Sequence, residues 1–285
     1  MRVSAPPRLG LLSAQAAFRA LFQARPPGAQ PFCLRPQFTT PPSCTIQPMS
    51  IPGRRESAAL LLSLEPPPWH LRHSRAVAEV AAWLARRAVA AGRSVDRRLA
   101  ESAALLHDVD KLALARPEVE GLAHAEGSAV WLARRGYPEL GPAIVGHPVT
   151  RLADAAWFAR WLAEATPEAL IVAYADKRAG QRLESMTDRF ASWGRRYPPA
   201  ERAVRARGVW TAATFEEVRA RAAELEHRVC ELASVAPGDV QRLAWTGRAI
   251  ASVRATAVGG AAAQSAAEAA AAAAAADPAA GRGAH

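Results

Sequence analysis

Hydrophobic and polar residues alternate along the middle of the chain with the period of an α-helix. Between residues 74 and 91, for example, Val77, Val80 and Leu84 fall on one helical face, and Gly92 ends the pattern. No segment has the alternation of Val, Ile and Thr that is typical of a strand. The sequence therefore predicts an all-α fold. Its helices are expected over 74–91, 96–107, 125–135, 139–147, 167–193, 214–233 and 238–254.

Capping residues give two of these helices a defined start. Thr166 followed by Pro167 is a favoured N-cap and first-turn pair for the helix over 167–193. Thr214, with Glu217 three residues later, has the form of a capping box for the helix over 214–233. Both starts offer side-chain partners to the free N–H groups of the first turn.

The two ends of the chain lack the helical pattern. Residues 1–48 are rich in Pro and contain Arg but no acidic residue. We expect a disordered extension there, which is either an organelle-targeting segment or a stretch upstream of a true start at Met49. Residues 255–285 are rich in Ala and Gly, and we expect a disordered tail. The main domain is expected over 49–200, with a C-terminal helical extension over 201–254.

Composition narrows the classes of protein. Hydrophobic residues make up 50% of the chain and charged residues 22%, which favours a folded core over a disordered or fibrous protein. Three cysteines are too few for a disulfide scaffold or a Cys-ligated zinc site, and they suit a reducing compartment. The sequence contains no run of roughly 18 bulky apolar residues, so it predicts no membrane span. We therefore expect a cytoplasmic protein with no membrane partner.

The net charge of +10 suggests nucleic acid at first sight. Five of these charges come from arginines in residues 1–48. In the rest of the chain, arginines alternate with Glu and Asp along the predicted helices, which is typical of solvated helix faces. This distribution argues against a nucleic-acid partner.

Histidines and aspartates gather in the predicted helical core. Asp108 directly follows His107 at the end of an apolar run, and Asp176 lies in the apolar segment IVAYADK, where an unpaired acid is costly. Singly, each has an ordinary explanation, such as a helix cap or an ion pair. Their joint order is more informative, because imidazoles and carboxylates are the ligands of iron, manganese and zinc. The candidate set is His73, His107, Asp108, His124, His147 and Asp176.

The stretches around these residues resemble the HD-domain superfamily of metal-dependent phosphohydrolases. They are HSRAVAEVAAWLA at His73, ALLHDVDK at His107, HAEGSAVWLARRG at His124, IVGHP at His147 and YADKRAG at Asp176. The resemblance covers roughly residues 60–195 and is strongest to six-ligand, HDIG-like members of the dinucleoside-polyphosphate hydrolase type. It implies a helical bundle over the main domain, with extra C-terminal helices.

The resemblance also implies a binuclear metal site. His73, His107 and Asp176 would bind a first divalent ion, His124 and His147 would bind a second, and Asp108 would bridge both. The ions would be iron, manganese or another transition metal. In such a site a metal-activated hydroxide attacks the phosphorus of a nucleotide or another small phosphate ester.

Basic residues near the candidate ligands are expected to bind the phosphate of the substrate. Lys111 occupies the lysine position of the family's His-Asp-x-x-Lys form and, with Asp108, is the expected catalytic pair. Lys177 and Arg178 are further candidates. The chain departs from the family pattern at Asp110, where a small residue is usual, and this acid would either repel phosphate or point outward.

Three further points stay open in the sequence. His70 competes with His73 as first ligand, but it follows Pro68 and Trp69 in a loop-like stretch, so His73 is preferred. The same six ligands also serve di-iron oxygenases of this fold, so an oxygenase is an alternative. A non-catalytic nucleotide sensor or interaction module is the third reading.

Overall fold

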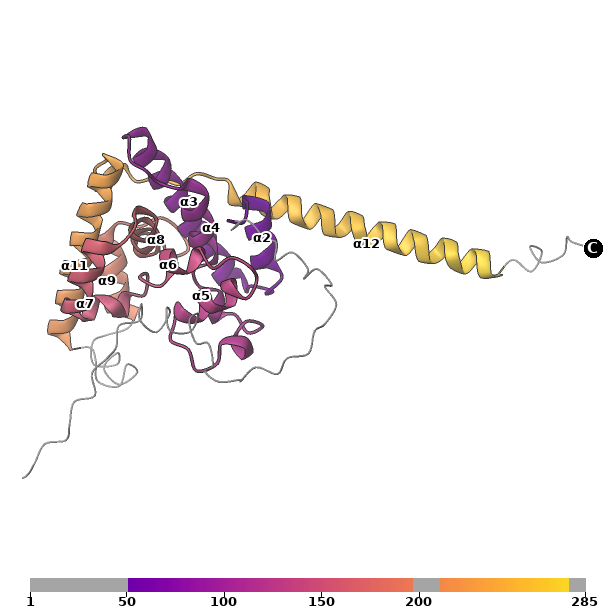
Figure 1. The fold of residues 1–285 in the computed structure, drawn as a ribbon, viewed down its shortest axis with the longest axis horizontal. Coiled ribbons are helices and arrows are strands. Elements are labelled where there is room, and N and C mark those ends of the chain that lie inside the picture. The colour runs from indigo at the N-terminus through magenta and orange to yellow at the C-terminus, as the bar shows by residue number, and fades with distance from the viewer. Residues whose placement is uncertain (1–50, 197–210, 277–285) are drawn as a thin grey trace, which may run out of the picture. The chain divides into compact units, whose positions relative to one another are not determined.

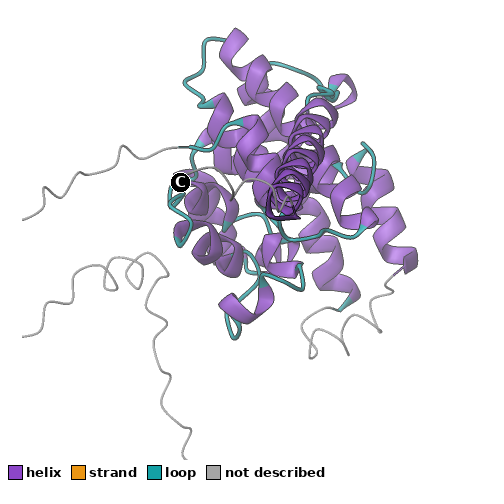
Figure 2. Cartoon of the chain, turned by 90° about the vertical axis from the view of Figure 1, so that its right-hand side faces the viewer, coloured by secondary structure: helices purple, strands orange, loops and turns teal. Residues whose placement is uncertain are grey.

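The computed structural model describes residues 51–196 and 211–276. The expected extension over 1–48 and the last part of the expected tail, 277–285, lie outside these residues. Within them every regular element is a helix, and the only strand-like pairing is an isolated bridge between Ala179 and Leu183 (Figure 2). The prediction of an all-α fold is confirmed.

The elements follow one another as α-helices joined by short 3-10 turns (Figure 1). The α-helices are α2 (Arg54–Leu62), α3 (Pro68–Ala90), α4 (Arg97–Leu106), α5 (Glu126–Ala133), α6 (Leu140–Ile144), α7 (Ala155–Glu164), α8 (Pro167–Arg178), α9 (Met186–Arg196), α11 (Ala212–Ala233) and α12 (Thr246–Ala276). The 3-10 turns are η1 (Val109–Lys111), η2 (Arg116–Val119), η3 (Val149–Ala153) and η4 (Pro237–Asp239).

The centre of the fold is a bundle in which α3, α4 and α8 pack on one another (Figure 1). Leu84, Leu105 and Ile171, one from each helix, have no exposed surface. Burying such a side chain contributes roughly 1.5–3 kcal/mol. Helix α11 packs on α3 and α8, and its Leu225 joins the same hydrophobic core. The C-terminal helical extension therefore shares a core with the rest of the domain.

Two helix starts differ from the sequence prediction. Helix α3 begins at Pro68, because Pro67 and Pro68 suit the N-cap and first position, so His70 is helical and not in a loop. Helix α11 begins at Ala212, and the hydroxyl of Thr211 accepts the N–H of Thr214 at 3.1 Å. The capping box expected at Thr214 is therefore wrong, because Thr211 already satisfies that N–H group.

The single helix expected over 167–193 is two helices, α8 and α9. Thr166 caps the start of α8 as predicted, accepting the N–H of Ala169 at 3.3 Å. After Arg178 the backbone turns extended, and the N–H of Glu184 reaches back to the carbonyl of Arg178 at 2.7 Å. This turn contains Gly180, whose carbonyl faces α3 and accepts a hydrogen bond from His73.

The last helix starts later and ends later than the predicted 238–254. Around its start, the chain is attached to α3 at Glu79, whose buried carboxylate pairs with Arg242 at 2.5 Å and accepts the hydroxyl of Thr246, the first residue of α12. The helix then continues to Ala276, whereas a disordered tail was expected from residue 255. None of the described helices combines the length and the apolar character that a membrane crossing needs.

Candidate metal centre

All six candidate ligands predicted from the sequence meet at one place in the fold. They come from separate elements, and the core packing of α3, α4 and α8 brings most of them together. His73 lies in α3, His107 and Asp108 directly follow α4, His124 precedes α5, His147 follows α6, and Asp176 lies in the last turn of α8.

The first group of ligand atoms lies where α3, α4 and α8 converge. The Nε2 atoms of His73 and His107 are 3.2 Å apart. Both face Oδ1 of Asp176, at 3.4 Å from His73 and 3.7 Å from His107. Oδ2 of Asp108 is 3.5 Å from each of the two Nε2 atoms. Two imidazoles and two carboxylates thus point at a common centre.

The second group lies on the other side of Asp108. The Nε2 atoms of His124 and His147 are 3.1 Å apart. They lie 3.3 Å and 3.2 Å from Oδ1 of Asp108, the oxygen that does not face the first group. Asp108 therefore presents one carboxylate oxygen to each group.

The hydrogen bonds behind the rings leave the facing nitrogens free to bind metal. Nδ1 of His73 donates to the carbonyl of Gly180, that of His107 to Ala104 and that of His147 to Ile144, each at 2.8 Å. A proton on Nδ1 leaves Nε2 as a lone-pair donor, which is how metal-binding histidines are oriented. Two such lone pairs about 3 Å apart repel each other unless a cation lies between them. The residues therefore fit divalent metal ions.

Electrostatics favours negative carboxylates in this cluster. Burial would raise the pKa of Asp108, but the nearby His107 and Lys111 hold that pKa well below its usual value. Burial acts on Asp176 in the same sense, and hydrogen bonds from His107 and His73 likewise lower its pKa well below the usual range. Burial lowers the pKa of His147 to about 4. Charged carboxylates beside neutral imidazoles are the protonation states that a cation needs. Burial would lower the pKa of His73, but its hydrogen bonds to Asp108 and Asp176 raise that pKa to about 10, so a metal ion bound there would displace a proton from Nε2.

His70, the rival of His73, lies behind the cluster and outside it. It is fully buried, and its Nε2 donates to the backbone carbonyl of Asp108 at 3.2 Å while Nδ1 faces the hydroxyl of Ser74 at 3.3 Å. Burial lowers the pKa of His70 to about 4, so the ring is neutral. The ring therefore fixes the backbone of Asp108, and the preference for His73 as the residue facing Asp176 agrees with the geometry.

Lys111 is the basic residue that the structure places at the cluster. Its Nζ donates to Oδ2 of Asp108 at 2.8 Å, and 41% of its side chain is exposed. Desolvation would lower the pKa of Lys111, but the charge of Asp108 raises it, so the ammonium group stays charged. The ammonium group thus lies between the buried carboxylate and solvent.

Lys177 and Arg178 were expected to face phosphate, and the structure gives both another role. Nζ of Lys177 is buried and donates to the backbone carbonyls of His147 at 2.7 Å and Ala173 at 3.2 Å. The buried guanidinium of Arg178 donates to the hydroxyl of Tyr174 and pairs with Glu226 on α11 at 3.3 Å. Helix α8 is buried on nearly every side, so its two cations are used inside the protein.

Asp110 does not point outward, as one reading of the sequence had it. Its carboxylate oxygens lie 3.0 and 3.1 Å from Nδ1 of His124, and Oδ2 accepts the N–H of Ala125 at 2.8 Å. Burial would raise the pKa of Asp110, but His124 lowers it. The acid therefore supports a candidate ligand. The sequence signal was its departure from the family pattern, which gave no hint of its partner.

A cavity of about 550 Å³ opens beside the cluster. It lies between η1, η2 and the turn before α5, and its lining includes Lys111, Arg116, Leu122 and His124. His124 is 34% exposed, whereas His107 has no exposed side-chain surface. The cluster is therefore approached from the side of His124 and Lys111.

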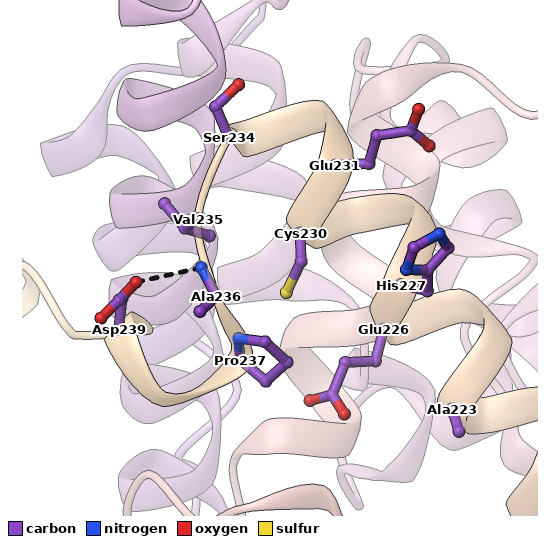
Figure 3. Close-up of a pocket in the computed structure, with 10 residues that line it drawn as sticks. All are labelled: Ala223, Glu226, His227, Cys230, Glu231, Ser234, Val235, Ala236, Pro237 and Asp239. Atoms are coloured by element: carbon purple, nitrogen blue, oxygen red, sulfur yellow. Dashed lines mark hydrogen bonds between the residues drawn. The ribbon is translucent and has the colours of Figure 1, made fainter.

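A second cavity, of about 590 Å³, lies at the C-terminal end of α11 and shares no residue with the cluster. Figure 3 shows Cys230 and Glu226 at its wall, and a hydrogen bond from the N–H of Ala236 to Asp239 at its rim. Burial raises the pKa of the Cys230 thiol. A neutral, buried thiol is a poor nucleophile, so this cavity offers no comparable chemistry.

One of three comparisons with known proteins, that with protein families, found a match. Neither a curated protein nor a solved structure matches the chain. The HD domain family matches residues 71–180, a segment that begins just before His73 and ends just after Asp176. HD domains are commonly metal-dependent hydrolases. Seven side chains of this segment, the six predicted ligands and Asp110, form three overlapping groups that could hold a metal ion. The match supports placing residues 71–180, with the cluster that they carry, in the HD superfamily.

Proposed function

We propose that this protein is a binuclear, metal-dependent phosphohydrolase that acts on a nucleotide or another small phosphate ester. The observation that carries the proposal is the position of Asp108, which presents one carboxylate oxygen to His73 and His107 and the other to His124 and His147. A single ion would need ligands on one side of this carboxylate only. The two-sided arrangement is what a bridging ligand requires.

The residues that would hold the ions follow from this division. His73, His107 and Asp176 would hold one ion, His124 and His147 the other, and Asp108 both. Divalent ions bound there would supply Lewis acidity and a bound water molecule with a pKa of about 7.

The residues of the chain itself would bind and orient the substrate. Lys111 keeps its charge and is exposed beside Asp108, so its ammonium group is available to a phosphate oxygen. The adjoining cavity, with Arg116 in its lining, offers room for the rest of the substrate. The buried back of the cluster, where His107 lies, excludes water from the other side.

The test begins with elemental analysis of the full chain purified without oxygen. We expect about two transition-metal ions per chain, phosphate release from nucleotides, and release of nucleotide products when dinucleoside polyphosphates are offered. His147→Ala should lose the activity, whereas His227→Ala should keep it, because His227 is an exposed histidine on α11 outside the cluster.

Other results would point to the alternatives. Two iron ions with oxygen uptake and no phosphate release would replace the hydrolase by a di-iron oxygenase. Metal binding with neither reaction, and a biological activity that survives Asp108→Ala, would indicate a nucleotide sensor or interaction module. One ion or fewer per wild-type chain would overturn the binuclear site.

A further inference from the structure

The four histidines of the cluster are not held in the same way. His73, His107 and His147 each donate Nδ1–H to a backbone carbonyl, which is fixed by the fold. His124 alone donates to a side chain, the carboxylate of Asp110. The orientation of the His124 ring therefore depends on the side chain of one other residue, which a single substitution can remove.

His124 also lies on the least regular backbone of the four. It precedes α5, and the next residue, Ala125, has a φ of +74°, a conformation that residues with a side chain rarely adopt. Oδ2 of Asp110 accepts the N–H of this same Ala125 at 2.8 Å. One carboxylate thus holds both the imidazole ring and the strained backbone beside it.

The first turn of α5 is shaped to receive Asp110. The hydroxyl of the buried Ser128 accepts the backbone N–H of Asp110 at 3.2 Å. Gly127 leaves the space for its side chain, because a Cβ atom at position 127 would lie only 2.9 Å from Cβ of Asp110. The position of Asp110 is therefore set by three residues: Ala125 directly before α5, and Gly127 and Ser128 in the first turn of α5.

We propose that Asp110 is a positioning residue that holds His124 with Nε2 facing Asp108 and His147, and so controls occupancy of the second metal position. The inference rests on the proposed binuclear function. A carboxylate behind a metal-binding imidazole fixes the tautomer and raises the basicity of the ligating nitrogen. Removing such a partner lowers metal affinity by about 10- to 100-fold.

Titration of the metal-free full chain with Mn²⁺ alone tests the proposal, with stoichiometry and affinity followed by electron paramagnetic resonance. Wild type should bind two ions and give the signal of a coupled pair. Asp110→Ala should bind the first ion normally and the second about 10- to 100-fold more weakly, so that the signal of an isolated ion persists. Asp110→Asn should lie close to wild type, because its amide oxygen can still accept from Nδ1 of His124.

Glu120→Ala is the matched control, since it removes the same charge from the lining of the same cavity. Both Mn²⁺ affinities should stay unchanged in this variant. A similar loss in Glu120→Ala would show that charge alone is responsible and would overturn the positioning role.

The remaining outcomes separate this inference from the proposed function. Wild-type affinities in Asp110→Ala would overturn the inference and leave the binuclear site intact. Equal losses in Asp110→Asn and Asp110→Ala would make Asp110 a direct ligand, which also overturns it. A wild type that binds one Mn²⁺ would overturn the binuclear function and this inference with it.

Discussion

The two halves of the cluster are built on different kinds of backbone. The helix-borne ligands, His73, His107 and Asp176, lie on or at the ends of α3, α4 and α8, which pack on one another in the core. The loop-borne ligands, His124 and His147, lie before α5 and after α6. The first set lies on packed helices and its imidazoles bond backbone carbonyls, whereas the second set also uses the side chains of Asp110 and Lys177. A site can thus combine a rigid half with a half that single substitutions adjust.

The largest expected effect comes from removing the residue that both halves share. Asp108→Ala should bind neither ion and lose turnover by roughly a thousandfold or more, because Lewis-acid stabilisation is worth several kcal/mol and each 1.4 kcal/mol is about tenfold. Metal content and phosphate release check this. Two ions still bound in Asp108→Ala would show that the carboxylate does not bridge.

A matched pair of variants separates the halves. His107 and His147 are both buried, and each donates Nδ1–H to the carbonyl three residues earlier. His107→Ala should lose the ion of the helix-borne ligands, and His147→Ala should lose the other ion first. Metal content per chain, measured at rising metal concentration, checks this. Identical binding curves for the two variants would mean that the halves do not act as separate sites.

Arg178→Ala should weaken the scaffold of the helix-borne half and leave the chemistry intact. It leaves the half-buried Glu226 and the buried Tyr174 without their cationic partner, and breaking such a pair costs up to about 3 kcal/mol of unfolding free energy. Urea unfolding measures the loss, with Arg228→Ala as control, because Arg228 is an exposed α11 arginine whose ion pair is worth at most about 1 kcal/mol. A raised KM with unchanged stability would instead restore Arg178 as a phosphate ligand.

The smallest effect is expected at the entrance beside the loop-borne half. Lys111→Ala should retain both ions and raise KM by about tenfold, since a hydrogen bond to a charged group is worth about 1.5–3 kcal/mol. Steady-state kinetics with metal analysis checks this, and Lys111→Arg should recover part of the affinity. Kinetics unchanged from wild type would make Lys111 an ordinary surface lysine.

The six residues predicted as ligands lie together in the fold, because the signal was spread over five stretches of sequence that resemble the HD-domain superfamily; their role as metal ligands stays a prediction. The sequence predicted the all-α fold for a similar reason, since helical periodicity spans many residues. The facing of Lys177 and Arg178 could not be predicted, because α8 is apolar around most of its circumference and gives no exposed side to read. Only Gly180 indicates in the sequence that the helix expected over 167–193 ends at Arg178 and a new helix follows.

The role of Asp110 could not be predicted for a different reason. Its partner His124 is 14 residues away, across an irregular segment with no periodicity that relates the two. The turn between them depends on a positive φ at Ala125, and alanine carries no sequence signal for that conformation. Such contacts between loops are set by tertiary structure alone.

The attachment of the C-terminal segment to α3 and α8 affects whether residues 71–180, the segment that matches the HD domain family, can fold alone. Two ionic groups inside residues 71–180 depend on later residues: Glu79 is matched by Arg242, and Arg178 by Glu226. An excised fragment would lose both counter-charges together with the packing of α11 on α3 and α8, and this loss falls on a typical total stability of only about 5–15 kcal/mol. The stretch that carries the recognisable pattern is thus shorter than the stretch that can stand as an independent folding unit.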